Sequence, residues 1–383
     1  MAEGFRRFRV ARKHPESSVI TSFHLEPEDG GALWDMRPGQ YLTLRLPLEG
    51  QSVLRTYSLS ALPDGCNHHR ISVKREDMGL GSGWLHDNVA EGDVLEIAAP
   101  RGHFFLNEDS ARPVLLLAGG VGQTPLMAML QKLAGTQRRA WFLHAVENGE
   151  VHALRNEAAA IAAASQGRIA VRHIYRNPSD QDRSAGRFDA EGVIDREFLQ
   201  KLLPIDDYEV YLCGPTPFMV AMWRLLTGLG IAPERIAYEF FGKGGSLAAL
   251  AAEADAPRNS DRRMPVHAPK SLERLEYLTD PDARALPERV AVAAAATGDA
   301  TEVVFARSGV TAAWTEASGS LLELAEAAGL NPAFSCREGI CNTCRCGLAE
   351  GMVEYTSDPL DPPPAGQALI CCSRPSGRIV LDL

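Results

Sequence analysis

Hydrophobic and polar residues alternate in short runs along the first part of the chain. The runs SVITSFHLEP, QYLTLRLPL, RTYSLSA, HRISVKRE and DVLEIAAP each have the pattern of a strand with one apolar face. Turn-forming stretches such as EDGG and RPG separate them. Short strands at this spacing predict a small antiparallel β-barrel, which we assign to residues 1–110. We expect its first strand where Phe5, Phe8 and Val10 alternate with arginines.

After residue 110 the strand-like runs become continuously apolar and alternate with helical periodicity. The strands are PVLLLAGG, WFLHAV, IAVRHIY, EVYLCGP and IAYEFF, and apolar helical stretches such as LMAMLQKLAG and PFMVAMWRLL lie between them. This alternation predicts an α/β domain with a parallel sheet over residues 111–242. Such sheets bind ligands at the carboxyl ends of their strands. Two of these ends carry glycine turns, at residues 119–125 and 213–215, whose backbone N–H groups suit a pyrophosphate.

The remaining residues divide into a linker and a third domain. Residues 243–298 mix Ala, Pro, Gly and charged residues, which predicts a long linker with one short helix near 271–278. From 299 to 383 the chain forms a third, α+β unit. In it TEVVFARSGVTAAWTEA has the pattern of a hairpin, SLLELAEAAGL that of an amphipathic helix, and RIVLDL that of a final strand.

Composition narrows the class of protein. The chain has 383 residues, 45% hydrophobic and 23% charged, and a net charge of −10, which argues against nucleic acid as a partner. No apolar run approaches the roughly 20 residues that cross a bilayer, and the basic N-terminus has no apolar core of a signal peptide. Eight cysteines, several of them grouped, suit a reducing compartment. We therefore expect a cytoplasmic protein with no membrane contact.

The cysteines near the C-terminus have a characteristic spacing. Four residues separate Cys336 from Cys341 and two separate Cys341 from Cys344, while Cys371 and Cys372 follow later. C-x4-C-x2-C with a distant cysteine is the plant-type spacing that holds a 2Fe–2S cluster. Structural zinc sites usually use two pairs of close ligands and fit this spacing poorly. A disulfide knot is the other alternative.

In the barrel segment the motif RTYS is followed by the glycine-rich turn GLGSG and then by the glycine-rich nucleotide loop. With these motifs in this order the chain resembles the ferredoxin–NADP reductase superfamily. In that family the Arg binds the flavin phosphate, the Tyr packs on the isoalloxazine and the Ser hydrogen-bonds near flavin N5. The resemblance assigns flavin contacts to Tyr41, Arg55, Thr56, Tyr57, Ser58 and Ser82, with Ser82 at the pyrophosphate. The alternative is that Tyr57 is only a core residue and Arg55 only a surface charge.

Over residues 5 to 242 the chain is also similar to the reductase half of flavohaemoglobins, on the motifs GGVGQTP, HAxxNG, YLCGPxPFM and YEFFG. The resemblance implies that Thr124 and Cys213 lie near the nicotinamide and that Glu239 and Phe241 cover the other side of the flavin. It assigns pyridine nucleotide binding to Gly120, Val121, Gly122, Gln123, Thr124, Pro125, Cys213, Gly214 and Pro215. Core packing is the alternative for Phe241, and a small buried hydrophobe is the alternative for Cys213. We expect no globin domain before residue 5, and the resemblance is therefore not expected to extend to nitric oxide dioxygenation.

The last 85 residues resemble plant-type ferredoxin domains with a β-grasp fold. In those domains the fourth ligand lies four residues before a proline, so Pro375 favours Cys371 over Cys372. The SxWLHD segment is closer to FAD-using than to FMN-using relatives. NADH is favoured over NADPH, although Arg176 or Arg183 would suit a 2′-phosphate.

Together the three modules predict an NAD(P)H-dependent electron-transfer reductase with FAD and a 2Fe–2S cluster. Ser58, Thr124, Cys213 and Glu239 are the expected catalytic residues. The expected acceptor is a redox protein partner, an oxygenase component, with a Rieske-type oxygenase favoured. Di-iron or haem-thiolate monooxygenases and molybdenum-cofactor enzymes remain open. An electron-shuttling or redox-sensing subunit without nicotinamide turnover is the alternative from another class. Glu338, Glu350 and Glu354 are candidates for docking the partner.

Overall fold

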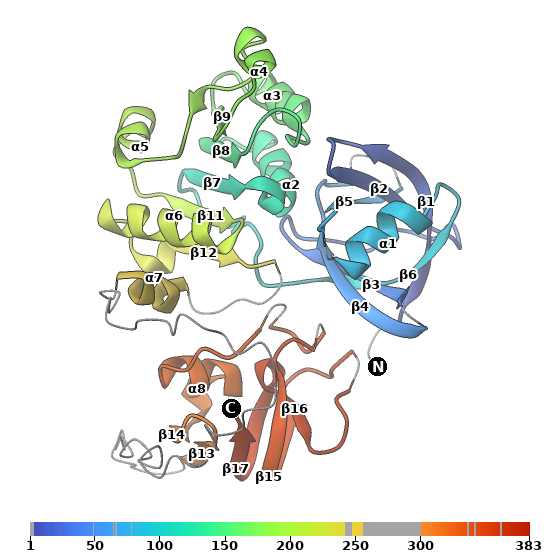
Figure 1. Cartoon of the computed structure of the whole chain (residues 1–383), viewed down its shortest axis with the longest axis vertical. Coiled ribbons are helices and arrows are strands. Elements are labelled where there is room, and N and C mark those ends of the chain that lie inside the picture. The colour runs from blue at the N-terminus through green and yellow to red at the C-terminus, as the bar shows by residue number, and fades with distance from the viewer. Residues whose placement is uncertain are drawn as a thin grey trace, which may run out of the picture.

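Three domains follow one another along the chain (Figure 1). The computed structural model describes residues 4–48, 50–63, 65, 67–77, 79–241, 247–255, 300–334, 337–340, 342–360 and 362–383. Each domain is built on one sheet, the first antiparallel, the second parallel and the third mixed. The predicted fold class is therefore confirmed. In the described residues no helix is long and apolar enough to cross a bilayer.

The first domain is the antiparallel barrel. Its strands lie in the order β4-β3-β6-β1-β2-β5, and an antiparallel bridge between Leu59, just after β4, and Ile71 in β5 brings the two end strands together. Alternation along each strand sends residues such as Phe8, Val10 and Leu44 into a common core. The elements are β1 (Arg6–Pro15), β2 (Ile20–Pro27), β3 (Tyr41–Leu48), β4 (Gln51–Ser58), β5 (His69–Lys74), α1 (Leu80–Asn88) and β6 (Val94–Arg101).

The second domain is a parallel sheet in the order β10-β9-β8-β7-β11-β12. Its central strands β7 and β11 are buried along their whole length, which explains their continuous apolar runs. The elements are β7 (Val114–Gly119), η1 (Gly120–Gly122), α2 (Gln123–Ala134), β8 (Ala140–Val146), α3 (Arg155–Ala164), β9 (Ile169–Tyr175), α4 (Asp180–Ser184), β10 (Ala190–Glu191), α5 (Arg196–Leu202), β11 (Glu209–Cys213), α6 (Thr216–Gly228), η2 (Pro233–Arg235) and β12 (Ile236–Glu239).

Strand order places the ligand-binding edge of this sheet. From β7 the chain moves outward through β8, β9 and β10, then returns to the other side of β7 as β11 and β12. The order therefore reverses between β7 and β11, and the turns that follow these two strands lie side by side. Such a switch point is where open parallel sheets bind nucleotides.

The predicted linker starts with structure of its own. Residues 247–255 form helix α7 (Leu247–Asp255), and Leu247 and Ala251 pack into the apolar core on which α6 lies. This stretch is therefore helix bound to the nucleotide domain and not tether. The short helix expected near 271–278 lies outside the described residues.

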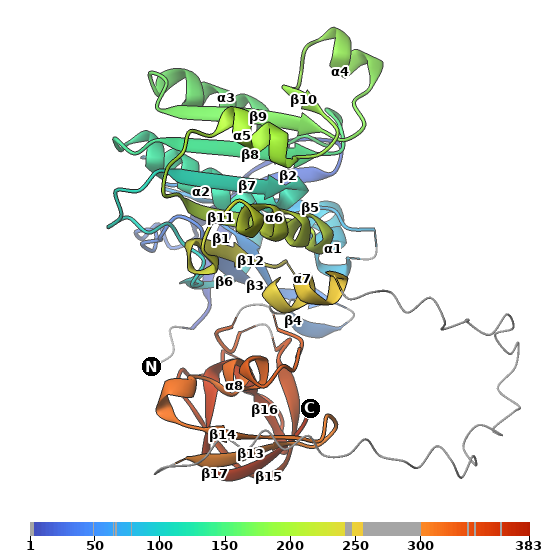
Figure 2. The same ribbon diagram turned by 90° about the vertical axis from the view of Figure 1, so that its left-hand side faces the viewer.

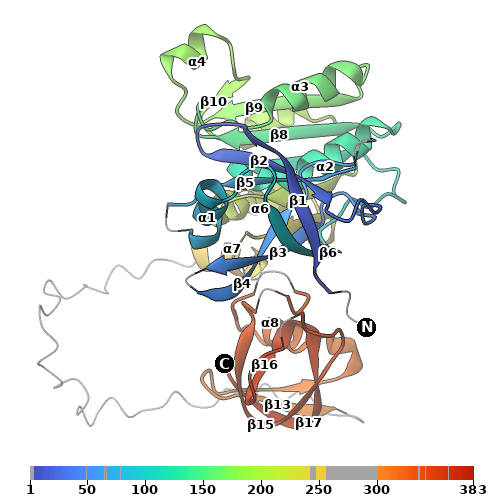
Figure 3. The same ribbon diagram turned by 90° about the vertical axis from the view of Figure 1, so that its right-hand side faces the viewer.

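The third domain is a mixed sheet in the order β14-β13-β17-β15-β16, covered by one helix. A capping box between Ser320 and Glu323 begins that helix, α8. The elements are β13 (Thr301–Phe305), β14 (Val310–Trp314), η5 (Glu316–Ser318), α8 (Leu321–Ala327), β15 (Arg345–Tyr355), β16 (Gln367–Leu369), η6 (Ile370–Cys372) and β17 (Ser373–Asp382). The domain lies at one end of the molecule, with the loop between α8 and β15 toward the other two domains (Figures 2 and 3).

The barrel and the nucleotide domain share a continuous interface. Barrel residues Phe104 and Leu106 belong to the same apolar core as Leu126 and Met129 of α2. A buried ion pair reinforces it, because Arg70 of β5 binds Glu157 of α3 with N–O distances of 2.8 and 2.9 Å. This interface therefore fixes the position of the predicted flavin site relative to the predicted nucleotide site.

Candidate functional site: a flavin cleft, a nucleotide turn pair and a cluster loop

The two glycine turns of the nucleotide domain meet backbone to backbone. A Cβ on Gly122 would lie 2.2 Å from the carbonyl oxygen of Cys213, and one on Gly214 would lie 2.9 Å from the Cα of Gly119. Only glycine permits this approach. The predicted nucleotide residues of both turns are therefore brought together at the switch point. Pro215 is exposed beside them at the start of α6, while Gln123 and Pro125 are buried in α2.

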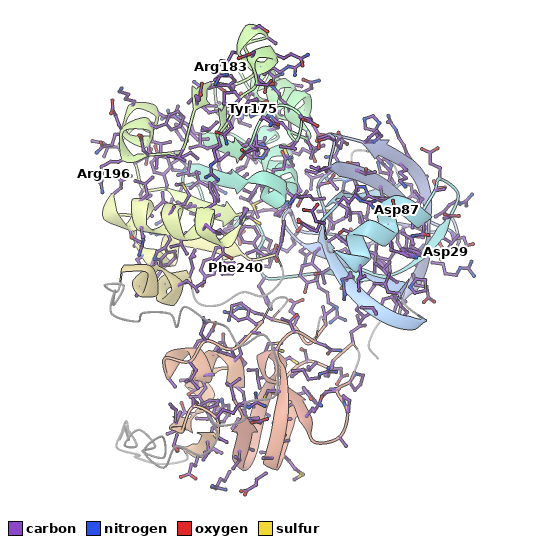
Figure 4. All side chains as sticks on the ribbon, in the orientation of Figure 1. Asp29, Asp87, Tyr175, Arg183, Arg196 and Phe240 are labelled. Carbon is purple, nitrogen blue, oxygen red and sulfur yellow. The ribbon has the colours of Figure 1, made fainter. Side chains whose placement is uncertain are left out.

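A cleft of about 500 Å³ opens between the barrel and the first of these turns, at residues 119–125. It collects residues from β3, β4, β5, α1, η1, α2 and the end of β12. Ten residues predicted as site residues line it: Tyr41, Arg55, Thr56, Tyr57, Ser58, Ser82, Val121, Thr124, Glu239 and Phe241. Lining residues that the sequence reasoning missed include Lys74, Glu76, Gly81 and Phe240. Phe240, labelled in Figure 4, is buried, whereas the next residue, Phe241, is 44% exposed.

The end of the cleft near α1 suits a phosphate. Arg55 makes no ion pair with any described residue, and its guanidinium bonds only the carbonyl of Leu54, at 2.9 Å. A Cβ on Gly81, in the first turn of α1, would lie 2.9 Å from Arg55 and 3.3 Å from the Tyr57 hydroxyl, so a glycine lets the helix approach β4. Ser82 donates to the carbonyl of Gly79 at 3.2 Å and so closes that turn. A free cation beside a helix N-terminus fits the pyrophosphate of FAD.

The middle of the cleft is less polar. Burial raises the pKa of Tyr57 to about 12, so its phenol is neutral and its ring is available for packing. Ser58 is 6% exposed, and Thr124 donates to the carbonyl of Val121 at 3.1 Å. These side chains fit a flat aromatic ring system with a few polar edges.

Cys213 lies behind the cleft and not in its wall. Its side chain is fully buried in the core under the glycine turns, and burial, with a smaller contribution from Glu239, raises the pKa of its thiol well above the usual value. A protonated buried thiol is a poor nucleophile. The part of Cys213 that faces the other turn is its backbone.

The loop that carries the cysteines has an unusual backbone. Arg337, Gly339 and Asn342 all have positive φ, at 55°, 69° and 59°. The N–H of Gly339 points at the sulfur of Cys371, 3.3 Å away. By contrast, the thiol of Cys372 donates to the carbonyl of Leu369 at 3.6 Å. A backbone N–H aimed at a sulfur is the arrangement that cluster thiolates require.

Of the four predicted cluster ligands, Cys344 and Cys371 are buried in one core with Cys372. Cys336 and Cys341 lie outside the described residues. Cys346, two residues after Cys344, is half-buried in β15, and burial raises the pKa of its thiol to about 12. The described cysteines and the Gly339 N–H fit a 2Fe–2S cluster.

The cysteine loop rests on the flavin barrel. The hydroxyl of Tyr41 donates to Glu338 at 3.2 Å, and the Nε2 of His103 lies 3.1 Å from the other oxygen of that carboxylate. Ile340 and Leu360 pack with the ring of Tyr41. Tyr41 also lines the flavin cleft, so one side chain contacts both sites.

The three acidic residues expected to dock a partner already form contacts within the chain. Glu338 faces the barrel and its side chain is only 16% exposed. Glu350 pairs with Arg378 and Glu354 with Arg374, both on the outer surface of the sheet. Glu338 is therefore an internal contact. No sequence signal distinguished it from the other two, since the contact joins residues 297 positions apart.

Three family profiles match the chain in the order of these domains. They are the oxidoreductase FAD-binding domain over residues 7–106, the oxidoreductase NAD-binding domain over residues 116–224 and the 2Fe-2S iron-sulfur cluster binding domain over residues 304–376. The chain is an NAD(P)H-dependent flavin and iron–sulfur oxidoreductase. The predicted superfamily and the predicted cofactors FAD, pyridine nucleotide and 2Fe–2S are thereby confirmed.

One kind of relative matches part of the chain. The chain is 44% identical over 252 residues to a flavohemoprotein of Bacillus thuringiensis subsp. konkukian, a match that covers 63% of this chain and 62% of the relative. The structure of the flavohem-like FAD/NAD binding domain of nitric oxide dioxygenase from Vibrio cholerae is 38% identical, with a TM-score of 0.56, over 62% of this chain and 99% of that one. The reductase thus spans about 62% of the length of the curated relatives it matches.

A second kind of relative matches the whole reductase. Phthalate dioxygenase reductase, described as a modular structure for electron transfer from pyridine nucleotides to [2Fe-2S], has 25% sequence identity and a TM-score of 0.53. That match covers 99% of this chain and 98% of the other. All three domains therefore have counterparts in one solved reductase.

Proposed function

We propose that the reductase carries electrons from a pyridine nucleotide through FAD and its 2Fe–2S cluster to an oxygenase component. The observation that carries this proposal is the contact of Tyr41, a wall of the flavin cleft, with Glu338 and Ile340 of the cysteine loop. A short path between the two sites suits internal electron transfer. When bound, the flavin would supply the hydride acceptor for the nicotinamide and the one-electron donor for the cluster.

The residues of the chain position and shield these groups. Arg55 and the N-terminus of α1 bind the FAD pyrophosphate, Tyr57 packs on the ring system, and Ser58 offers a hydroxyl to its edge. Thr124 and the backbone of Cys213 orient the nicotinamide, while Glu239 and Phe241 close the other side. Phe241 is exposed enough to move aside for the nucleotide.

We propose Cys336, Cys341, Cys344 and Cys371 as the cluster ligands. The Gly339 N–H directed at Cys371 supports the choice of that residue over Cys372, whose thiol donates to a carbonyl. A thiol that donates a hydrogen bond still carries its proton, whereas a cluster ligand is a thiolate.

NADH is the proposed nucleotide. Arg183, one candidate for a 2′-phosphate contact, already binds Asp180 and Glu191, the latter at 2.8 Å. A guanidinium between two carboxylates is less available to a phosphate. Arg183 lies at the far end of the nucleotide domain (Figure 4). The ratio of kcat/KM for NADH to that for NADPH is expected to exceed one, and the opposite preference would reject this assignment.

The test of the electron path is anaerobic titration with NADH, followed by visible absorbance and low-temperature electron paramagnetic resonance. We expect flavin bleaching together with the rhombic signal of a reduced 2Fe–2S centre. Flavin bleaching without that signal would contradict the cluster assignment and would indicate a simple flavin reductase. Glu338→Ala should slow reduction of the cluster but not of the flavin, and Glu350→Ala on the outer surface is the matched control.

The acceptor is tested separately with purified oxygenase components. A Rieske-type oxygenase should form product in step with NADH consumption. Support for this acceptor comes from the relative that is a dioxygenase reductase and matches all three domains. Product formation only with a haem-thiolate or di-iron component would move the assignment there. Failure to sustain NADH oxidation with any one-electron acceptor would favour a shuttle or sensor.

A further inference from the structure

Three buried side chains of the nucleotide domain form a continuous hydrogen-bonded chain. His144 lies in β8, His152 in the segment before α3 and Tyr175 at the end of β9. The Nε2 of His144 is 2.9 Å from the carbonyl oxygen of Gly120, its Nδ1 is 3.1 Å from the Nε2 of His152, and the Nδ1 of His152 is 2.7 Å from the Tyr175 hydroxyl. All three side chains are at most 6% exposed. Tyr175 lies in the upper part of the domain (Figure 4).

The carbonyl at one end fixes the direction of every hydrogen bond. A carbonyl oxygen only accepts, so the proton lies on Nε2 of His144. Burial lowers the pKa of His144 to about 3 and also lowers that of His152, so both rings are neutral. The Nδ1 of neutral His144 must then accept from Nε2–H of His152, and the Nδ1 of His152 must accept from Tyr175. Each bond in the chain is satisfied by one arrangement of protons.

The peptide that this chain holds belongs to the glycine turn at the nucleotide site. Gly120 has φ of +52° and begins η1, directly after β7. In a planar trans peptide the C=O of one residue and the N–H of the next point in opposite directions. Because His144 holds the Gly120 carbonyl toward the interior, the N–H of Val121 is turned the other way. Val121 is half-buried and lines the cleft.

A metal site is a poorer description of the same cluster. One nitrogen from each of His144, His152 and His173 lies within 4.8 Å of the others, but a common metal at about 2.1 Å would bring all pairs within about 4.2 Å. The closest pair is already at hydrogen-bond distance, 3.1 Å. The positive charge of Arg155 is close enough to lower the pKa of His152 and of His173, and it would repel a cation.

We propose that His144, His152 and Tyr175 are positioning residues for the dinucleotide pyrophosphate, acting through the peptide between Gly120 and Val121. They fix that peptide so that the Val121 N–H faces the bound phosphates and the carbonyl does not. A reversed peptide would present an oxygen to an anion. The inference rests on the proposed nucleotide site and adds residues that do not touch the nucleotide.

The test uses competitive inhibition of NADH oxidation by ADP-ribose, which carries the pyrophosphate, and by adenosine, which does not. In His144→Leu we expect the inhibition constant of ADP-ribose to rise roughly tenfold to hundredfold, the range for one hydrogen bond to a charged group, while that of adenosine stays constant. His144→Gln, whose amide can donate to the same carbonyl, should restore much of the loss. Tyr175→Phe removes the last donor and should weaken ADP-ribose by a smaller factor.

His173→Leu is the matched control. This histidine is buried in the same cluster, 6% exposed, but its Nδ1 has no hydrogen-bond partner among the described residues and it takes no part in the chain. Its removal should leave the ADP-ribose constant unchanged, with FAD content equal in all variants.

Several results would overturn the inference. Equal losses for ADP-ribose and adenosine in His144→Leu, or no loss at all, would remove the role at the pyrophosphate. If His144→Leu does not fold, Tyr175→Phe decides the question. Weaker ADP-ribose inhibition in Tyr175→Phe, with unchanged inhibition in His144→Gln and His173→Leu, would still support the hydrogen-bonded chain. Unchanged ADP-ribose inhibition in Tyr175→Phe would reject it. Stoichiometric zinc that disappears in His173→Leu would make the cluster a metal site. Wild-type protein that binds neither NADH nor ADP-ribose would instead reject the proposed function.

Discussion

The ion pair between Arg70 and Glu157 should be a main support of the two-domain flavin and nucleotide module. Arg70 is 10% exposed at its side chain and makes four hydrogen bonds, two of them to Glu157 and two to Ser60. Glu157 also accepts from Gln131 of α2 at 2.6 Å. The perturbation is Arg70→Met, which keeps the length of the side chain and removes its charge and donors.

The expected loss can be estimated from burial and geometry. Removing one partner of a buried ion pair costs about 3–5 kcal/mol, because the other charge is left behind. Glu157 is 27% exposed and keeps the bond from Gln131, so water and the amide offset part of that cost. We therefore expect a loss of about 2–4 kcal/mol in the free energy of unfolding. For a module of this size that corresponds to a fall in Tm of roughly 5–15 °C.

The assay is thermal unfolding followed by FAD fluorescence and far-ultraviolet circular dichroism. Arg75→Met is the control, because Arg75 binds Asp87 with the same two-bond geometry, 2.6 and 2.8 Å, but on the exposed face of the barrel (Figure 4). Exposed pairs contribute little, so this control should melt like the wild type. A fall in Tm for Arg70→Met no larger than for Arg75→Met would refute the reasoning. The double variant with Glu157→Gln should show a clear coupling energy.

Three further predictions concern the cysteines and the glycine turn. Cys371→Ser should abolish the 2Fe–2S resonance signal while Cys372→Ser keeps it, and the reverse result would exchange the two assignments. Gly122→Ala places a Cβ 2.2 Å from a carbonyl oxygen of the facing turn. The value of kcat/KM for NADH should therefore fall roughly tenfold or more at unchanged FAD content. Normal kinetics in this variant would mean that the two turns separate freely. Because burial raises the pKa of the Cys213 thiol, this thiol stays protonated at pH 8.5. Iodoacetamide should therefore label the Cys213 peptide only after denaturation, as measured by mass spectrometry. Rapid labelling of the native protein would contradict this prediction.

Much of the architecture could be predicted because local patterns control it. Period-two alternation produced the strands of the barrel, and continuous apolar runs such as LLL in β7 marked the buried parallel strands. Glycines at the ends of β7 and β11 marked the nucleotide site because close backbone approach permits no side chain there. Ten of the predicted site residues line one cleft, because the motifs that carry the family resemblance lie on elements that the fold brings together there.

The predictions were weaker where the sequence lacks a local signal. Residues 247–255 had the composition of a linker, yet their apolar residues pack into the core beside α6 as helix α7. Alanine-rich segments have high helix propensity but little hydrophobic contrast, so composition alone did not separate helix from tether. Glu338 looked like a surface acid because nothing in its neighbourhood indicates the distant Tyr41.

By itself the sequence determined the three domains, the order of the cofactor sites and the spacing of the cysteines, since backbone periodicity and turn chemistry act over a few residues. Tertiary structure alone decided that the Gly339 N–H is directed at a sulfur, which acid lies against the flavin barrel, and that His144, His152 and Tyr175 join into one chain. Those features depend on side-chain directions across elements far apart in sequence. Packing of the elements fixes such directions, and no local pattern encodes them.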